Sequence, residues 1–185
     1  TKTGVTTFFI DDKIDTGAMI LSSEIEIGAN ENAGQLHDRL MQLGSKTVTE
    51  TLALIERGNV ITTIQKDKNP IKTAHKLDKE NCKIDWSKSG IEIYNLIRGL
   101  SPYPSAWCFF SDGNQEWNIK IYKAEFEQEK HSIDIGTIVA TKKDLKISVK
   151  DGFIKIINLQ FPGKKRMDSN ELLNGMDFSK ITNAL

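Results

Sequence analysis

The sequence predicts an α/β part followed by a β part: the end of an α/β domain over residues 1–65, then a small antiparallel β-barrel domain over residues 86–185. Three observations predict this order. Two strand-like apolar runs precede a long stretch with helical apolar spacing. A lysine-rich segment, residues 66–85, follows and indicates a basic linker. Beyond it, short apolar runs alternate with turns such as Asp151-Gly152, a strong hairpin signal.

In the first part, residues 5–10 and 18–27 are predicted strands, because both runs are rich in β-branched and aromatic residues. The polar residues 11–17 between them predict a loop. A helix should follow, capped by Asn30 or Asn32 and ended by Gly58. Its predicted buried stripe is Leu36, Leu40, Leu43, Val48, Leu52 and Ile55. Two strands make a poor sheet for such a helix, so we expect further strands upstream. Thr1 is not an initiator methionine, and we expect the chain to be part of a longer protein.

In the second part, residues 86–100 have helical spacing, and the prolines that follow should end that helix. Five strands are predicted within the next 60 or so residues, and a short helix around Leu172 and Leu173. The predicted strands cover residues 106–110, 117–124, 137–140, 145–149 and 153–161. Short antiparallel strands in this number favour a small barrel.

The net charge of zero conceals opposite local charges. Residues 1–65 have 5 basic and 9 acidic side chains, whereas residues 141–166 have 8 basic and 2 acidic ones. A clustered basic charge attracts phosphate backbones, although charge alone favours the simpler interpretation, a solvated lysine face. No apolar run is long enough to span a membrane. Cys82 and Cys108 match no zinc or redox spacing, so we expect free thiols, no metal and a cytoplasmic protein.

The segment Ile14-Asp15-Thr16-Gly17 resembles the aspartate loop of folate-dependent formyltransferases. Later motifs follow the order found in the methionyl-tRNA formyltransferases, and this resemblance covers nearly the whole chain. These motifs are Leu36-His37-Asp38-Arg39-Leu40, Ala74-His75-Lys76-Leu77-Asp78-Lys79-Glu80, Ile84-Asp85-Trp86, Ile97-Arg98-Gly99-Leu100-Ser101-Pro102-Tyr103-Pro104-Ser105-Ala106-Trp107 and Pro162-Gly163-Lys164-Lys165-Arg166-Met167. The resemblance implies that the first part ends a Rossmann-like formyltransferase domain and that the barrel is OB-like.

The resemblance also implies a formyl transfer from 10-formyltetrahydrofolate to the amino group of methionyl initiator tRNA. In this family the catalytic set is an asparagine, a histidine and an aspartate, and only the aspartate has a counterpart here, Asp15. Asp11, Asp12 and Ile14 are the expected folate-lining positions. An aspartate before Gly17 is also a common turn residue, so a purely structural role is the alternative. We expect the 185 residues alone to be inactive.

Lysines of 72–83 and 142–166 are candidates for tRNA contact, since phosphate contacts position a nucleic acid. The predicted tRNA-binding residues are Lys72, Lys76, Lys79, Lys164, Lys165 and Arg166. The three tryptophans could stack on bases, but core packing of a small barrel is the favoured role.

Two other hypotheses stay open. One is a formyltransferase with the same two-domain plan that acts on a nucleotide sugar. The other is a nucleic-acid-binding module without enzymatic activity. We expect the intact enzyme to be a monomer without membrane contact, whereas the fragment, with its incomplete sheet, would self-associate or leave residues 1–65 poorly packed.

Overall fold

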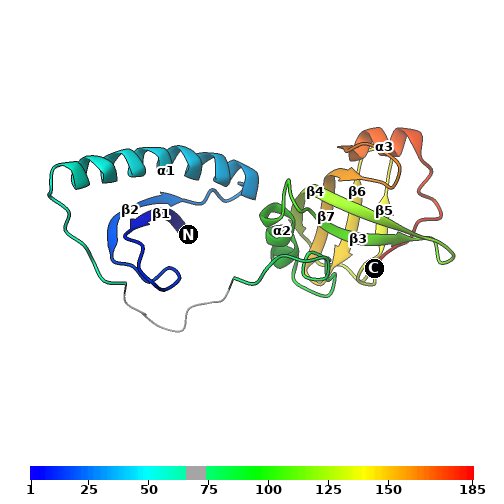
Figure 1. Ribbon diagram of the computed structural model, residues 1–185. Helices are drawn as coiled ribbons and strands as arrows, with labels where there is room; N and C mark the ends of the chain where they lie inside the picture. The colour runs from blue at the N-terminus through cyan, green and yellow to red at the C-terminus, as the bar shows by residue number, and fades with distance from the viewer. Residues whose placement is uncertain (66–73) are drawn as a thin grey trace. The chain divides into compact units, whose positions relative to one another are not determined.

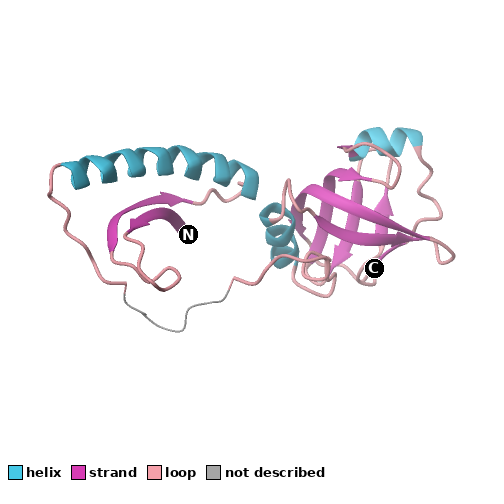
Figure 2. Cartoon of the chain, in the orientation of Figure 1, coloured by secondary structure: helices cyan, strands magenta, loops and turns pink. Residues whose placement is uncertain are grey.

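The computed structural model describes residues 1–65 and 74–185, which belong to two compact units, Thr1–His75 and Lys76–Leu185 (Figure 1). We call them unit 1 and unit 2. Helix and sheet are both present in each unit, as the colouring of Figure 2 shows. Among the described residues, no helix is long and apolar enough to cross a membrane.

Unit 1 consists of a β-hairpin and one long helix. Strands β1 (Lys2–Phe8) and β2 (Met19–Glu26) pair antiparallel, and helix α1 (Ala33–Glu56) packs against both. Asn32 caps the helix: its side chain accepts a hydrogen bond from the Gln35 backbone N–H at 2.9 Å, and the Gln35 side chain accepts one from the Asn32 N–H at 3.0 Å. Gly58 follows the helix with a φ of +66°, which confirms the predicted C-terminal signal.

The predicted buried stripe of α1 is wrong beyond Gly44. Thr47 and Thr51 are buried, whereas Val48, Leu52 and Ile55 are exposed. The two threonines can face the hairpin because their hydroxyl groups find partners there. Thr47 Oγ1 donates to Ser23 Oγ at 2.9 Å, and the hydroxyls of Thr51 and Thr7 lie 2.8 Å apart. Hydroxyl contacts therefore join this part of the helix to the hairpin, and Val48, Leu52 and Ile55 are exposed.

Unit 2 is a nearly closed antiparallel β-barrel with two helices. Its sheet order is β5-β6-β7-β4-β3-β9, and β8 pairs with β7. The elements are α2 (Gly90–Gly99), β3 (Ala106–Ser111), β4 (Glu116–Gln128), β5 (Ile138–Ala140), β6 (Leu145–Val149), β7 (Gly152–Gln160), β8 (Met167–Asp168), α3 (Ser169–Gly175) and β9 (Asn183–Ala184). The ends of this path approach each other, because Ile138 N–H donates to Thr182 O at 2.8 Å and Ala184 N–H donates to Gly136 O at 2.7 Å.

The core of the described chain lies within unit 2. Helix α2 contributes Ile93 and Ile97, and it packs against β4 and β7. Residues 82–84 also join this unit: Trp107 N–H donates to Cys82 O at 3.1 Å, and Ile84 N–H donates to Trp107 O at 2.8 Å. In contrast, the described residues of unit 1 include no apolar side chain that is fully buried. Unit 2 thus has the means to fold by burial of apolar surface, and unit 1 does not.

This difference predicts how two truncations affect stability. Replacing the fully buried Ile147 of β6 with alanine should lower the free energy of unfolding of unit 2 by about 2–5 kcal/mol. Replacing Leu52, which is 61% exposed on α1, with alanine should change the free energy of unfolding of unit 2 by less than about 0.5 kcal/mol. Urea titration followed by tryptophan fluorescence reports on unit 2 alone, because all three tryptophans lie there. Equal losses for the two variants would contradict this division.

Candidate functional site

The loop between β1 and β2 places the four sequence-predicted catalytic and folate-lining residues together. Phe9 N–H donates to Ala18 O at 3.0 Å and closes the base of the loop. Within it, the Asp11 carboxylate accepts hydrogen bonds from Lys13 N–H at 3.0 Å and from the Thr16 hydroxyl at 2.8 Å. Asp11 therefore holds the loop in shape through a local turn motif.

Backbone conformation restricts two further positions of this loop. A Cβ atom at Gly17 would lie 1.5 Å from the carbonyl oxygen of Phe9, so only glycine fits there. Asp15 has a φ of +55°, in the left-handed region that aspartate tolerates better than most residues. Asp15 is exposed, and its carboxylate has no hydrogen bond or ion pair among the described residues. The fold thus presents a carboxylate that the loop itself does not use.

Gln65 fastens this loop from a position far along the chain. Its Nε2 donates to the backbone oxygens of Asp15 and Gly17, each at 2.9 Å. Thr63 and Met19 exchange two backbone hydrogen bonds, of 2.8 and 2.9 Å, which bring Gln65 to the loop. Sequence reasoning missed Gln65, because no local pattern links it to a loop about 50 residues earlier.

A second candidate site lies on the outer face of β3 and β4. Trp107 is paired with Lys120, and Phe109 with Asn118, and residues opposite each other across an antiparallel pair share a face. The alternate side chains, Cys108, Ile119 and Ile121, are fully buried and fill the barrel. The alternation of β4 therefore separates a core face from a face that is free for polar and aromatic side chains.

Two lysines of residues 76–85 lie over this outer face. The Trp107 Nε1–H donates to Lys79 O at 2.7 Å, which fixes the indole ring against that segment. The ammonium groups of Lys79 and Lys83 lie 5.2 and 5.7 Å from the centroid of the Trp107 ring, and that of Lys83 lies 5.5 Å from the Phe109 ring. These distances are those of cation–π contacts. Two positive charges are thereby held beside two aromatic rings.

The second basic cluster reaches the same face through β7. The Arg166 guanidinium lies 4.3 Å from the Tyr122 ring centroid and donates to Asn158 Oδ1. Tyr122 O–H donates to Gln160 Oε1 at 2.9 Å, and Gln160 Nε2 donates to the Lys164 backbone oxygen at 3.0 Å. Several hydrogen bonds and ring contacts thus hold the Lys164–Arg166 turn against β4 and β7.

Strand pairing joins the two clusters. Lys120 is the partner of Trp107 on one side and of Gln160 on the other. We therefore define a basic–aromatic face on the outer side of β3, β4 and β7. Its residues are Lys79, Lys83, Trp107, Phe109, Asn118, Lys120, Tyr122, Gln160 and Arg166.

The sequence-predicted basic residues have different positions relative to this face. Lys79 and Arg166 lie on it, whereas Lys76, Lys164 and Lys165 are exposed in the segments that border it. Lys72 lies outside the described residues. Sequence reasoning missed Lys120 and Tyr122, although their alternation with Ile119 and Ile121 is the signal that could have found them. Burial, expected for the tryptophans from core packing, is confirmed for Trp86 and Trp107, although Trp107 is covered on the outer face of β3 by the segment of Lys79 and Lys83.

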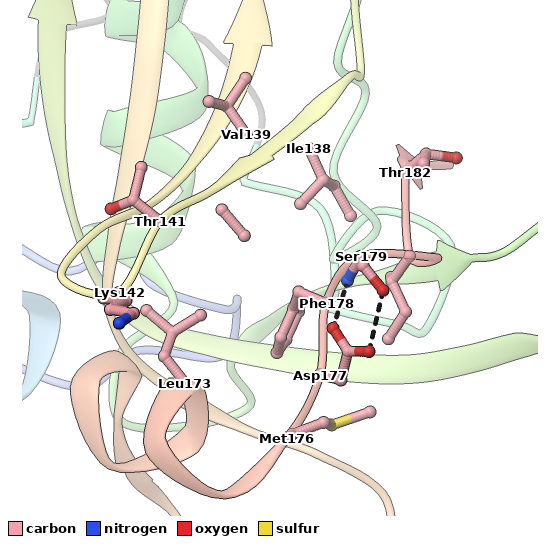
Figure 3. A pocket seen from close by; sticks show the side chains of 12 residues that line it. Ile138, Val139, Thr141, Lys142, Leu173, Met176, Asp177, Phe178, Ser179 and Thr182 are labelled. Atoms are coloured by element: carbon pink, nitrogen blue, oxygen red, sulfur yellow. Dashed lines mark hydrogen bonds between the residues drawn. The ribbon is translucent and has the colours of Figure 1, made fainter.

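A separate cavity of about 630 Å³ lies between β5 and the segment that follows α3 (Figure 3). Its walls are mostly apolar, as the side chains of Ile138, Leu173 and Phe178 show. The Asp177 carboxylate accepts two hydrogen bonds of 2.8 Å from Ser179, which lower the pKa of Asp177. Asp177 is the only acidic residue that lines the cavity, and its carboxylate is hydrogen-bonded within its own turn. The cavity therefore brings together no group of catalytic side chains.

Neither cysteine fits a catalytic role in unit 2. Both Cys82 and Cys108 are buried free thiols, as the sequence predicts. Burial raises the pKa of each thiol above its usual value, so both remain protonated at neutral pH. A nucleophilic thiolate is therefore not available at either position.

With this geometry established, comparison with known proteins defines the class. The chain matches the formyl transferase C-terminal domain family over residues 76–177 and the formyl transferase family over residues 1–52. The chain belongs to the formyl transferase family.

Its curated relatives are more specific. The methionyl-tRNA formyltransferase of Flavobacterium johnsoniae is 69% identical over 179 residues, which are 97% of this chain and 57% of that enzyme. The methionyl-tRNA formyltransferase of Bacteroides thetaiotaomicron is 41% identical over 184 residues, again 97% of this chain and 57% of the relative. The chain therefore spans a little over half the length of these relatives.

Solved structures share the fold. HypX from Aquifex aeolicus in complex with tetrahydrofolic acid has a TM-score of 0.65 at 18% identity, over 93% of this chain and 30% of that one. An N-formyltransferase from Helicobacter canadensis, in complex with folinic acid and dTDP-3-aminofucose, has a TM-score of 0.61 at 24% identity. The match covers 84% of this chain and 55% of that one.

The loop geometry predicts that two glycine substitutions in unit 1 differ in their effect on amide hydrogen exchange. Gly17→Ala should open the β1–β2 loop, because its Cβ would overlap the Phe9 carbonyl. Gly44→Ala is the matched control: its Cβ meets only Val5, at 3.9 Å, and alanine is the better helix former by about 1 kcal/mol. Amide hydrogen exchange of the Phe9 and Met19 N–H groups should accelerate in the first variant and not in the second. Unchanged exchange in Gly17→Ala would refute the loop geometry.

Proposed function

We propose that this chain is the C-terminal part of a methionyl-tRNA formyltransferase, an enzyme that transfers a formyl group from 10-formyltetrahydrofolate to the amino group of methionyl initiator tRNA. The observation that carries this proposal is the 69% identity with such an enzyme over 97% of the chain. Two features agree with it: the loop with the exposed Asp15, whose carboxylate has no partner among the described residues, and the basic–aromatic face of unit 2.

The proposed domain plan assigns residues 1–65 to the end of a Rossmann-like formyltransferase domain, 66–85 to a basic linker and 86–185 to an OB-like barrel domain. Support comes from the apolar side chains that unit 1 leaves exposed. Val48, Leu52 and Ile55 form one such row on α1, and Phe9 and Ile14 lie in and beside the loop. Surface of this kind needs covering. Further strands and helices of the same domain, in the part of the relatives that this chain does not span, are the proposed cover.

In the proposed reaction the methionyl amine attacks the formyl carbon, and the tetrahedral intermediate carries an oxyanion and a developing ammonium. When the intermediate collapses, the bond between the formyl carbon and the folate nitrogen breaks, and tetrahydrofolate leaves with the proton that the ammonium loses. Asp15 would assist proton transfer from that ammonium or orient a histidine that does so. An asparagine and a histidine, from the part that this chain does not span, would supply the donors for the oxyanion. The backbone and side chains of Asp11, Asp12 and Ile14 would line the folate ring system. A formyl donor of folate type is consistent with the fold shared with the tetrahydrofolate complex.

The basic–aromatic face would hold the tRNA through its phosphates. Lys79, Lys83, Lys120 and Arg166 supply four cations on one side of a rigid sheet. Lys76, Lys164 and Lys165 border them, and Lys72 is proposed to contribute as well. A face that binds phosphates positions an RNA without reading its sequence. We further propose that the intact enzyme acts as a monomer in the cytoplasm, and that the 185-residue fragment either self-associates through residues 1–65 or leaves them poorly packed.

Catalysis by Asp15 predicts a loss of formylation in a protein that combines this chain with the part of the relatives that it does not span. Asp15→Asn keeps the size of the side chain and should lower the rate at least about a hundredfold, because the carboxylate that handles the proton is gone. Glu56→Gln, at the exposed end of α1 and outside the loop, should retain most of the activity. The assay measures formyl transfer to methionyl-tRNA, with a dTDP-amino sugar as the competing acceptor. Equal effects of the two substitutions would remove Asp15 from catalysis, and formylation of the sugar alone would refute the proposed substrate.

Phosphate contact predicts a change in the salt dependence of tRNA binding to the 185-residue chain. Lys120→Ala and Arg166→Ala should each weaken binding and reduce the slope of log K against log salt by about one. Lys143→Ala is the control, because Lys143 is exposed in the turn between β5 and β6, outside the basic–aromatic face. Filter binding at several salt concentrations measures the slopes. If Lys143→Ala lowers the slope as much as the other two variants do, phosphate binding is not confined to the basic–aromatic face, and the proposed contact face is refuted.

A further inference from the structure

A second cavity of unit 2, of about 400 Å³, adjoins the basic–aromatic face at Trp107. Its lining combines aromatic rings, cationic groups and an amide. These groups belong to Lys79, Tyr103, Trp107, Asn118 and Lys120. The established family assignment gives this cavity no role, and the proposed phosphate contacts do not require it.

The walls of the cavity are held rigidly. Trp107 is buried, and its indole N–H bond to Lys79 O fixes one wall. The turn that carries Tyr103 is fixed on the other side, because the buried Ser105 donates its N–H to Leu100 O at 2.9 Å. Tyr103 itself is 86% exposed. A large aromatic side chain with this exposure, on an ordered turn at the rim of a cavity, is a surface on which a planar group can stack.

The polar groups around the cavity are of the kinds that a nucleotide requires. The ammonium of Lys79 lies over the Trp107 ring, and Lys120, the strand partner of Trp107, lines the same cavity, so two cationic side chains border it. Asn118 offers an amide with both a donor and an acceptor, which can bind a base edge. The one carboxylate in the lining, Asp78, accepts the Asn81 N–H at 2.8 Å and is thus engaged within its own turn.

We propose that this cavity binds one unpaired nucleotide of a bound RNA, with the base stacked on Tyr103, its edge at Asn118 and its phosphate between Lys79 and Lys120. The inference rests on the proposed function, because it takes an RNA as the ligand of unit 2. It adds a site for a single-stranded part of that RNA. A volume of about 400 Å³ accommodates a single nucleotide and excludes a base-paired helix.

The test uses the 185-residue chain and three probes: a fluorescein-labelled single-stranded RNA tetranucleotide, a labelled 12-base-pair RNA duplex, and adenosine monophosphate as a competitor. Fluorescence anisotropy measures the affinities. Tyr103→Ala should weaken binding of the tetranucleotide about tenfold, because a base that stacks on an aromatic ring loses its platform. Binding of the duplex should change less than twofold. Tyr103→Phe keeps the ring and should retain the affinity of the natural protein for both RNAs.

A matched control separates stacking from a general loss of apolar surface. Ile133→Ala removes an exposed apolar side chain of unit 2 outside the cavity and should leave both affinities unchanged. Because Tyr103 is so exposed, its replacement should not alter the fold, which the tryptophan fluorescence spectrum checks.

The outcomes are distinguishable. If Tyr103→Ala binds the tetranucleotide as tightly as the natural chain does, the nucleotide site is refuted while the proposed tRNA surface stands. If the natural chain binds neither RNA, the RNA-binding part of the proposed function fails and the nucleotide site fails with it. If adenosine monophosphate displaces the tetranucleotide at equal concentration, the cavity takes a free nucleotide, and its assignment to RNA is overturned.

Discussion

The pairing of β4 with β3 on one side and β7 on the other is the constraint on which unit 2 depends. One register fixes two faces at once: Ile119 and Ile121 point into the barrel, and Lys120 points outward between Trp107 and Gln160. A slip of a single residue would bury Lys120 and expose both isoleucines. The apolar core therefore selects the register, and the register in turn assembles the basic–aromatic face from segments far apart in the sequence.

Different interactions stabilise the two units. Unit 2 buries a continuous apolar cluster and can be stabilised by the hydrophobic effect. In unit 1 the described apolar side chains are at most partly buried, and hydroxyl contacts of Thr7, Ser23 and Thr51 help to join the helix to the hairpin. Such hydrogen bonds give specificity but contribute only about 1 kcal/mol each to stability. We therefore propose that the apolar faces of unit 1, which are exposed here, pack against the rest of a formyltransferase domain.

Most elements could be predicted from the sequence, because their signals are local. Strand alternation, the Asp151-Gly152 turn and the cap at Asn32 each act over a few residues, and the structure contains the expected strands and helices within a few positions. The helix stripe failed beyond Gly44 because threonine is polar by type, yet Thr47 and Thr51 are buried by partners on another element. Gln65 at the loop and Lys120 beside Trp107 were missed for a related reason. Their roles arise from contacts and strand pairing that no short window contains.

We propose that the register of β4 assembles a face on β3, β4 and β7 that binds RNA. Titration of methionyl-tRNA into the isotope-labelled chain, with the perturbed backbone amides mapped by NMR, tests this proposal. The strongest perturbations should fall on residues 79–83, 107–109, 118–122 and 158–166. Perturbations confined to β5, β6 and the cavity beside α3 would contradict it, because those segments lie outside the face that this register builds.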